Sequence, residues 1–251
     1  MTTNWVVKAI IVLILFKPTT SWANDIYINQ SGDNIDMTIV QDGENNVISS
    51  VAGNTRKAPI SGNNTNTTFT QTGDNNDIGV YMSAGNGQQT VTQTGNTNYA
   101  TSDCHGNNCS TTITQYGNNN LANLEFGNGG DYDQTGTITQ DGDYNAAGIE
   151  ANGDDNTFVI DQDGDNNAVG GITGAPITGN NNSLSITQNG DYMTFEGHLI
   201  GSNNSLTSFQ GGSANNSFIR VSTVGSNNTG DLRQGKRLDG NVDNNDSGNH
   251  A

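Results

Sequence analysis

A Gln residue that is followed two positions later by Gly recurs along nearly the whole chain. The series ends at Gln234, which Gly235 follows directly. From Gln41 to Gln234, successive Gln residues are 30, 22, 22, 25, 22, 26, 22 and 24 residues apart. A 22-residue unit with occasional insertions accounts for every interval. Such self-similarity is typical of repeat architectures, in which each repeat contacts only its neighbours. The repeat therefore constrains the fold more than any other feature of this sequence.

Each 22-residue unit divides into two halves of 11 residues, and both halves alternate apolar and polar positions. Ile78 and Val80 show this alternation in one half, and Phe158 and Ile160 show it in the other. Alternation with period two predicts short β-strands of about seven residues. The segments between them are rich in Gly, Asp and Asn, which form turns. We expect 18 strands between residues 24 and 234, arranged as nine strand-turn-strand units.

A single two-stranded unit cannot bury its apolar face in water, but stacked units extend one shared core. The sequence therefore predicts an all-β fold, a β-solenoid of about nine stacked strand-turn-strand repeats. At about 4.8 Å per layer, nine layers form a rod of roughly 43 Å.

Composition alone would favour disorder, because apolar residues make up only 31% of the chain and its net charge is −17. A core only two strands wide explains how so few apolar residues suffice. The acidic charge argues against nucleic-acid binding, which needs Lys and Arg. The sequence shows no carboxylate cluster, nucleophile motif, metal motif or phosphate loop. We therefore expect no catalytic residues, no metal and no cofactor, and an enzyme or lectin built on a β-helix is the least favoured function.

Side-chain amides occupy two fixed positions of the repeat. Each closing strand ends on Gln, at Gln41, Gln71, Gln93, Gln115, Gln140, Gln162, Gln188, Gln210 and Gln234. Five residues later an inward Asn opens the next strand, at Asn46, Asn76, Asn98, Asn120, Asn145, Asn167 and Asn215, with Met193 as the exception. Stacked in register, such amides form ladders that donate to one layer and accept from the other. The alternative, solvated turn residues, does not explain the fixed phase, so we predict that these residues support self-assembly.

The two ends of the chain differ from the repeats. Residues 1–23 resemble a signal peptide, with Lys8, an apolar run over 9–16 and a Ser21-Trp22-Ala23 cleavage site. The alternative is a membrane anchor, but the run is shorter than the ~20 residues that span a bilayer. Residues 24–234 then form the repeat domain, and 235–251 form a polar tail. Cleavage leaves six basic and 25 acidic residues, a net charge of −19.

The segments QDGENN at 41–46, QTGDNN at 71–76, QYGNNN at 115–120, QDGDYN at 140–145 and QDGDNN at 162–167 resemble the curlin repeat of curli fibre subunits, Gln-x-Gly-x-x-Asn. The resemblance covers nearly the whole mature chain. It implies a secreted protein that polymerises into extracellular amyloid fibres for adhesion and biofilm formation. Its implied partners are further copies of itself or other curlin-like subunits, and outer-membrane secretion machinery reached through the periplasm.

The chain departs from the curlin pattern in two positions. The family usually has Ser six residues before the Gln, whereas this chain has Asn156, Asn182 and Asn204. The family often has a second Gln six residues after the Asn. Here that position varies, as Gln30, Ala52, Met82, Cys104, Phe126, Ala151, Thr173, Leu199 and Val221.

Insertions are confined to one of the two turns. They follow Ala52, Phe126, Thr173 and Val221, while the Gln-x-Gly turns from Gln41 to Gln210 are expected to keep one length. One edge of the rod would then be uniform and the other decorated, as in solenoids whose insertions map to one face. The decorated edge is either a contact surface or the result of tolerated loop variation.

Cys104 and Cys109 are the only cysteines, and in an exported chain they predict a disulfide across one turn. A metal site with His105 and a free thiol pair are the alternatives. Asp is frequent in the turns, for example in DGDN at 163–166. We expect this Asp to limit premature aggregation, and calcium binding is the alternative.

Outward Thr-x-Thr pairs on consecutive strands suggest a second function. They are Thr68 with Thr70, Thr90 with Thr92, Thr112 with Thr114, and Thr137 with Thr139. A flat Thr array is how β-helical antifreeze proteins meet ice, so a monomeric ice-binding solenoid is the alternative to a fibre subunit. Thr also favours exposed strands by propensity, and the array breaks at Val159 and Asp161.

Overall fold

The computed structural model describes residues 24–26, 31–49, 60–80, 82, 86–103, 107–126, 133–170, 176–197, 199–211 and 217–235. The expected signal peptide and residues 236–251 lie outside this part of the chain, so both assignments stay predictions. Every regular element within the described ranges is a β-strand. No described residues form a helix long and apolar enough to cross a membrane.

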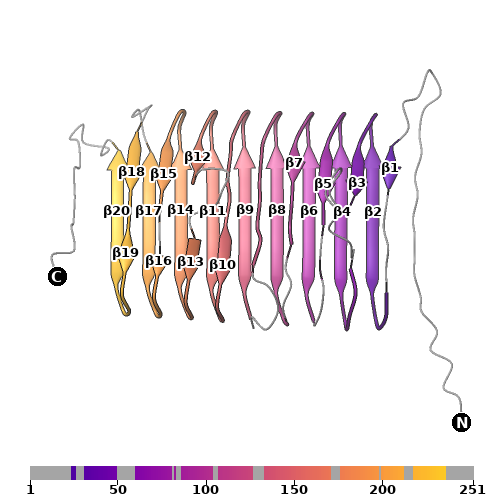
Figure 1. Ribbon diagram of the computed structural model, residues 1–251. Coiled ribbons are helices and arrows are strands. Elements are labelled where there is room, and N and C mark those ends of the chain that lie inside the picture. The colour runs from indigo at the N-terminus through magenta and orange to yellow at the C-terminus, as the bar shows by residue number, and fades with distance from the viewer. Residues whose placement is uncertain are drawn as a thin grey trace, which may run out of the picture.

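One wall of the molecule is a parallel sheet of nine strands, which lie side by side in chain order (Figure 1). Each strand has seven residues, with the repeat Gln at the sixth position, and each pairs in register with the next. The strands are β2 (Asp36–Asp42), β4 (Asn66–Thr72), β6 (Gln88–Thr94), β8 (Ser110–Tyr116), β9 (Thr135–Asp141), β11 (Thr157–Asp163), β14 (Ser183–Asn189), β17 (Ser205–Gly211) and β20 (Thr229–Gly235). The prediction of an all-β solenoid of stacked repeats is confirmed.

The opposite wall is built from shorter parallel strands. Those that follow the Gln turns are β1 (Asp25–Ile26), β3 (Val47–Ser49), β5 (Asp77–Gly79), β7 (Tyr99–Ala100), β12 (Ala168–Val169), β15 (Thr194–Glu196) and β18 (Phe218–Arg220). Single bridges through Leu121 and Ala146 connect β7 to β12. A second row contains β10 (Glu150–Asn152), β13 (Pro176–Thr178), β16 (Leu199–Ile200) and β19 (Thr223–Val224). The prediction of seven-residue strands is wrong for this wall, because insertions and turns interrupt the return path.

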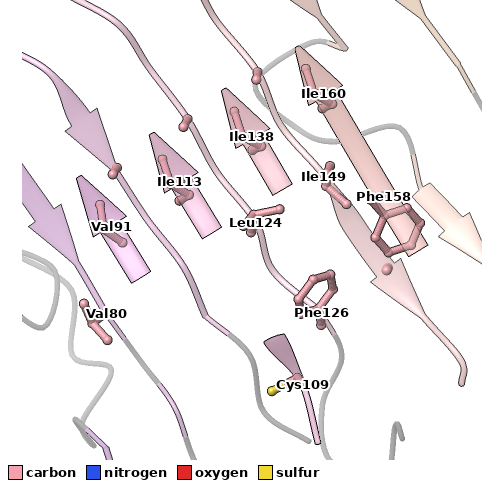
Figure 2. Close-up of a cluster of buried hydrophobic side chains, with 14 of the residues drawn as sticks. Val80, Val91, Cys109, Ile113, Leu124, Phe126, Ile138, Ile149, Phe158 and Ile160 are labelled. Carbon is pink, nitrogen blue, oxygen red and sulfur yellow. The ribbon is translucent and has the colours of Figure 1, made fainter. Parts of the chain in front are cut away.

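The core is a narrow strip between the two walls. Val91, Ile113 and Ile138 form a rank on consecutive strands of the nine-stranded sheet, and Leu124 and Ile149 face them from the opposite wall (Figure 2). These side chains are almost completely buried. Burying each of them stabilises the fold by roughly 1.5–3 kcal/mol relative to leaving it exposed, so a narrow core can hold the stack together.

Large and small residues alternate where the strip is tightest. Phe126 and Phe158 stack with ring centroids 5.9 Å apart. Gly136 pairs in register with Phe158, and a Cβ at Gly136 would lie 2.6 Å from Cζ of Phe126. The absent side chain of Gly136 therefore makes room for the aromatic pair.

The last repeat does not follow the predicted alignment. Ile219 pairs with Phe195, so Ser217 occupies the position beside Met193 that the sequence analysis gave to Asn215. Asn215 itself lies outside the described residues. This register places apolar Ile219 against the core, whereas the predicted alignment would have placed Ser217 there.

The extra residues of the last repeat consequently lie in a different turn. Thr223 pairs with Leu199, so Thr223 occupies the place in its layer that the sequence predicted for Val221. The insertion therefore falls after Gln210 and not after Val221, and the expected equal length of the Gln turns fails at Gln210. The other three insertions lie largely outside the described residues.

Candidate functional site

The seven turns that follow Gln41 to Gln188 share one backbone geometry, which only Gly permits at its second position. Gly95 has φ 115° and Thr97 has φ 59°, and the other Gln turns repeat both values closely. A Cβ at Gly95 would lie 1.9 Å from the carbonyl oxygen of Gly117 in the next layer. Gly therefore sets the close approach of layers, and the turn directs both Gln93 and Asn98 into the interior.

The Gln residues form a continuous row of hydrogen bonds along the rod. From Gln41 to Gln210, each amide Nε2 donates to Oε1 of the next Gln, over 2.7, 3.0, 2.9, 2.9, 2.8, 2.8 and 2.9 Å. The second amide hydrogen crosses the core, as when Gln115 donates to the carbonyl oxygen of Tyr99 over 3.1 Å. The row thus joins successive layers and also links the two walls.

Both ends of the Gln row are open. Gln210 donates to Ser217 Oγ over 3.1 Å, and Gln234 in the last layer is partly exposed. Oε1 of Gln234 and Oε1 of Gln41 are buried and have no hydrogen-bond partner. Gln234, which the sequence places in the row, is therefore not joined to it by Gln210.

The Asn row bonds mainly to backbone atoms. Asn98 Oδ1 accepts from the backbone N–H of Asn120 over 3.0 Å, and its Nδ2 donates to the carbonyl oxygen of Gly117 over 2.8 Å. The same pattern starts at Asn24, whose Oδ1 accepts from the N–H of Asn46 over 2.9 Å. The Asn side chains therefore fix the turn backbone. The expected amide-to-amide bonds occur from Asn76 to Asn46 and from Asn98 to Asn76, each over 3.1 Å.

Met193 interrupts the Asn row without breaking the stack. Its N–H donates to Oδ1 of Asn167 over 3.0 Å, and its side chain is completely buried. A flexible thioether side chain fills irregular gaps in a core, so this position tolerates the loss of one amide.

A second Asn row, which sequence reasoning missed, lies at the opposite turn in the C-terminal half. Asn182, Asn204 and Asn228 each donate their backbone N–H to Oδ1 of the preceding layer's Asn, over 2.9, 3.0 and 3.0 Å, beginning at Asn156. The signal was present in the sequence, because each of these Asn residues follows a Gly by three positions, as in the Gln turns.

An exposed row of Asp and Asn borders the Gln turns. In each of these layers, Oδ1 accepts from the backbone N–H of the layer before, for example from Asp143 to Asp165 over 2.7 Å. The turn Asp residues therefore bond to the backbone of neighbouring layers, and their expected role in limiting aggregation stays a prediction. On the sheet face nearby, burial, together with the charges of Asp163 and Asp141, raises the pKa of Asp161.

The structure leaves the other predicted sites open. Cys109 is buried and no free cysteine occurs in the described ranges. Cys104 lies outside them, so the Cys104–Cys109 disulfide stays a prediction. Within the same ranges, no group of three or more His, Cys, Asp or Glu residues could hold a metal ion.

Parallel strands stacked in register, with buried Gln and Asn rows along their turns, define a β-solenoid closed by amide rows. Residues 133–164 match the family model described as the curlin associated repeat. This segment contains β9, β11 and the Gln turn between them, and the match confirms the resemblance to the curlin-repeat family. No curated protein matches the chain. The curlin-repeat family is structural rather than enzymatic.

Proposed function

We propose that the mature chain is a secreted structural protein that assembles end to end into cross-β, curli-like fibres for adhesion and biofilm formation. It would cross the periplasm, engage outer-membrane secretion machinery, and act at the cell surface or in the extracellular matrix with copies of itself or related subunits. The repeat match and the solenoid fold support a structural role.

The observation that carries the proposal is the unfinished state of both ends of the stack. Within the described ranges, β2 pairs only with β4, and β20 pairs only with β17. Open strand edges template pairing with another chain, and natural monomers usually block them. Gln41 is only 8% exposed, yet its Oε1 has no partner. Such an orphaned acceptor costs about 1–3 kcal/mol, and an added layer would remove that cost.

Assembly of the purified mature chain tests the proposal. At neutral pH we expect a lag, then rising thioflavin-type fluorescence and sedimentable fibres in electron micrographs. Sonicated fibres should shorten the lag, because their ends supply open strand edges onto which further chains can add. Monomers that persist at every concentration would reject the fibre function.

The in-register Thr rows favour ice binding as the second candidate function. Thr68, Thr90, Thr112 and Thr137 are consecutive partners in the sheet, and Thr70, Thr92, Thr114 and Thr139 form a parallel row beside them. Strands β4, β6 and β8 carry no charged residue. Monomers that partition into growing ice would favour this function over the fibre if the Thr92→Lys variant no longer partitions into ice and the Thr187→Lys variant still does.

A further inference from the structure

The outward face of the nine-stranded sheet is almost free of charge over four consecutive strands. β4, β6 and β8 carry no charged residue, and β9 carries only Asp141, at its last position. Acidic residues of these layers lie instead on the Gln turns, as Asp74 does, and on the opposite wall, as Asp77 and Glu150 do. Residues 58–219 contain no Lys or Arg that could offset them. Two such rods therefore repel each other least when these four strands face each other.

We define the neutral face as the two Thr rows on β4, β6, β8 and β9, together with the uncharged residues that flank the rows on these strands. The Thr residues are half-buried and lie in register from strand to strand, so equal side chains recur about every 4.8 Å. A β-branched side chain has few rotamers, so docking against it costs little conformational entropy. Short, equal side chains on in-register strands can interdigitate with those of a second sheet, as in steric zippers.

The same sheet loses this regularity beyond β9. Val159 and Asp161 on β11 and Phe209 on β17 replace Thr in the two rows. On β20, Asp231 and Arg233 form an ion pair over 3.1 Å. Side chains of unequal length and charge do not interdigitate evenly with a second sheet. The neutral face therefore ends at β9 and occupies one defined part of each copy.

The area of the neutral face decides when docking can occur. Four strands of seven residues cover roughly 19 by 23 Å, or about 440 Å². A stable interface between two isolated proteins buries about 800 Å² per partner, so two single copies would not stay together through this face. A fibre contributes one neutral face per copy, and about two copies in each fibre reach the required area.

We infer that the neutral face is a docking surface for a second copy of this chain, through which two fibres pair side by side with their Thr rows interdigitated. The inference rests on the proposed function and adds the lateral contact between fibres. Because pairing needs several neutral faces in a row, it follows end-to-end assembly and does not precede it.

Fibre width in electron micrographs tests this docking surface. At ~150 mM salt, where charges are screened beyond about 8 Å, we expect paired fibres to predominate in the purified mature chain. Thr92→Glu places a charge in the middle of the neutral face and should lower the paired fraction about tenfold, because docking would bury that charge without a partner. Thr187→Glu is the matched control. Thr187 lies in the same row, next to Asp161 and outside the neutral face, so its fibres should pair as the unmodified ones do.

A second variant keeps the test decisive if Thr92→Glu assembles poorly. Asp161→Thr removes a charge and extends one Thr row by a strand. At ~10 mM salt, where repulsion between rods reaches about 30 Å, it should raise the paired fraction about twofold over that of the unmodified chain. An unchanged paired fraction would contradict the docking surface.

The remaining outcomes separate the lateral contact from the fibre itself. Thr92→Glu fibres that pair as often as Thr187→Glu fibres would overturn the docking surface. Unmodified fibres that stay single at ~150 mM salt would do the same, and both results leave the fibre function standing. An unmodified chain that does not assemble, as followed by thioflavin-type fluorescence, would overturn both proposals.

Discussion

Replacing Gly95 with Ala destabilises the stack by about 3 kcal/mol or more and suppresses fibre formation. The new Cβ would lie 1.9 Å from the carbonyl oxygen of Gly117, and the backbone φ of 115° is one that side chains rarely adopt. Both obstacles are backbone features, so no side-chain rearrangement can relieve them. Urea unfolding of the soluble chain and the critical concentration for assembly measure the effect.

Gly148→Ala is the matched control for this substitution. A Cβ at Gly148 would meet nothing within 4 Å, so its stability should stay within about 0.5 kcal/mol of the unmodified chain. Equal stability of the Gly95 and Gly148 variants would show that the close approach of turns is not what sets the layer spacing.

Replacing Gln115 with Ala has the second-largest expected effect, about 3 kcal/mol of lost stability and correspondingly slower assembly. The change removes the acceptor of Gln93, the donor to Oε1 of Gln140 and the donor to the carbonyl oxygen of Tyr99. Buried groups left without partners cost about 1–3 kcal/mol each. Chemical denaturation and assembly kinetics provide the measurement.

Gln88→Ala controls for the loss of a Gln from the same sheet. Gln88 begins β6 and its side chain is exposed, so we expect a change of no more than about 0.5 kcal/mol. If Gln115→Ala assembled at the rate of Gln88→Ala, the buried row would not be what drives stacking.

The regular part of the fold followed from the sequence because one physical signal repeats at every layer. Inward residues such as Ile113 and Ile138 alternate with outward Thr, and Gln115 and Gln140 share one phase with them. Parallel in-register stacking satisfies all of these patterns at once, so residue order outweighed a composition that favours disorder.

One error came from a position where the regular spacing and the packing of the core point to different residues. Counting five residues from Gln210 leads to Asn215, yet packing of Ile219 against the core selects Ser217 instead. Burial of apolar side chains decides which alignment forms, and the spacing of the Gln and Asn residues does not carry that information. The use of Asn oxygens as acceptors for backbone N–H groups likewise depends on how close the turns approach, which only the three-dimensional stack reveals.

X-ray diffraction from aligned fibres of the mature chain tests most directly whether the layers of the rod continue from copy to copy. Strands perpendicular to a continuous stack should give a meridional reflection at about 4.7–4.8 Å and an equatorial reflection near about 10 Å. Fibres that lack the meridional reflection would contradict the account, because their chains would be associated without extending the solenoid.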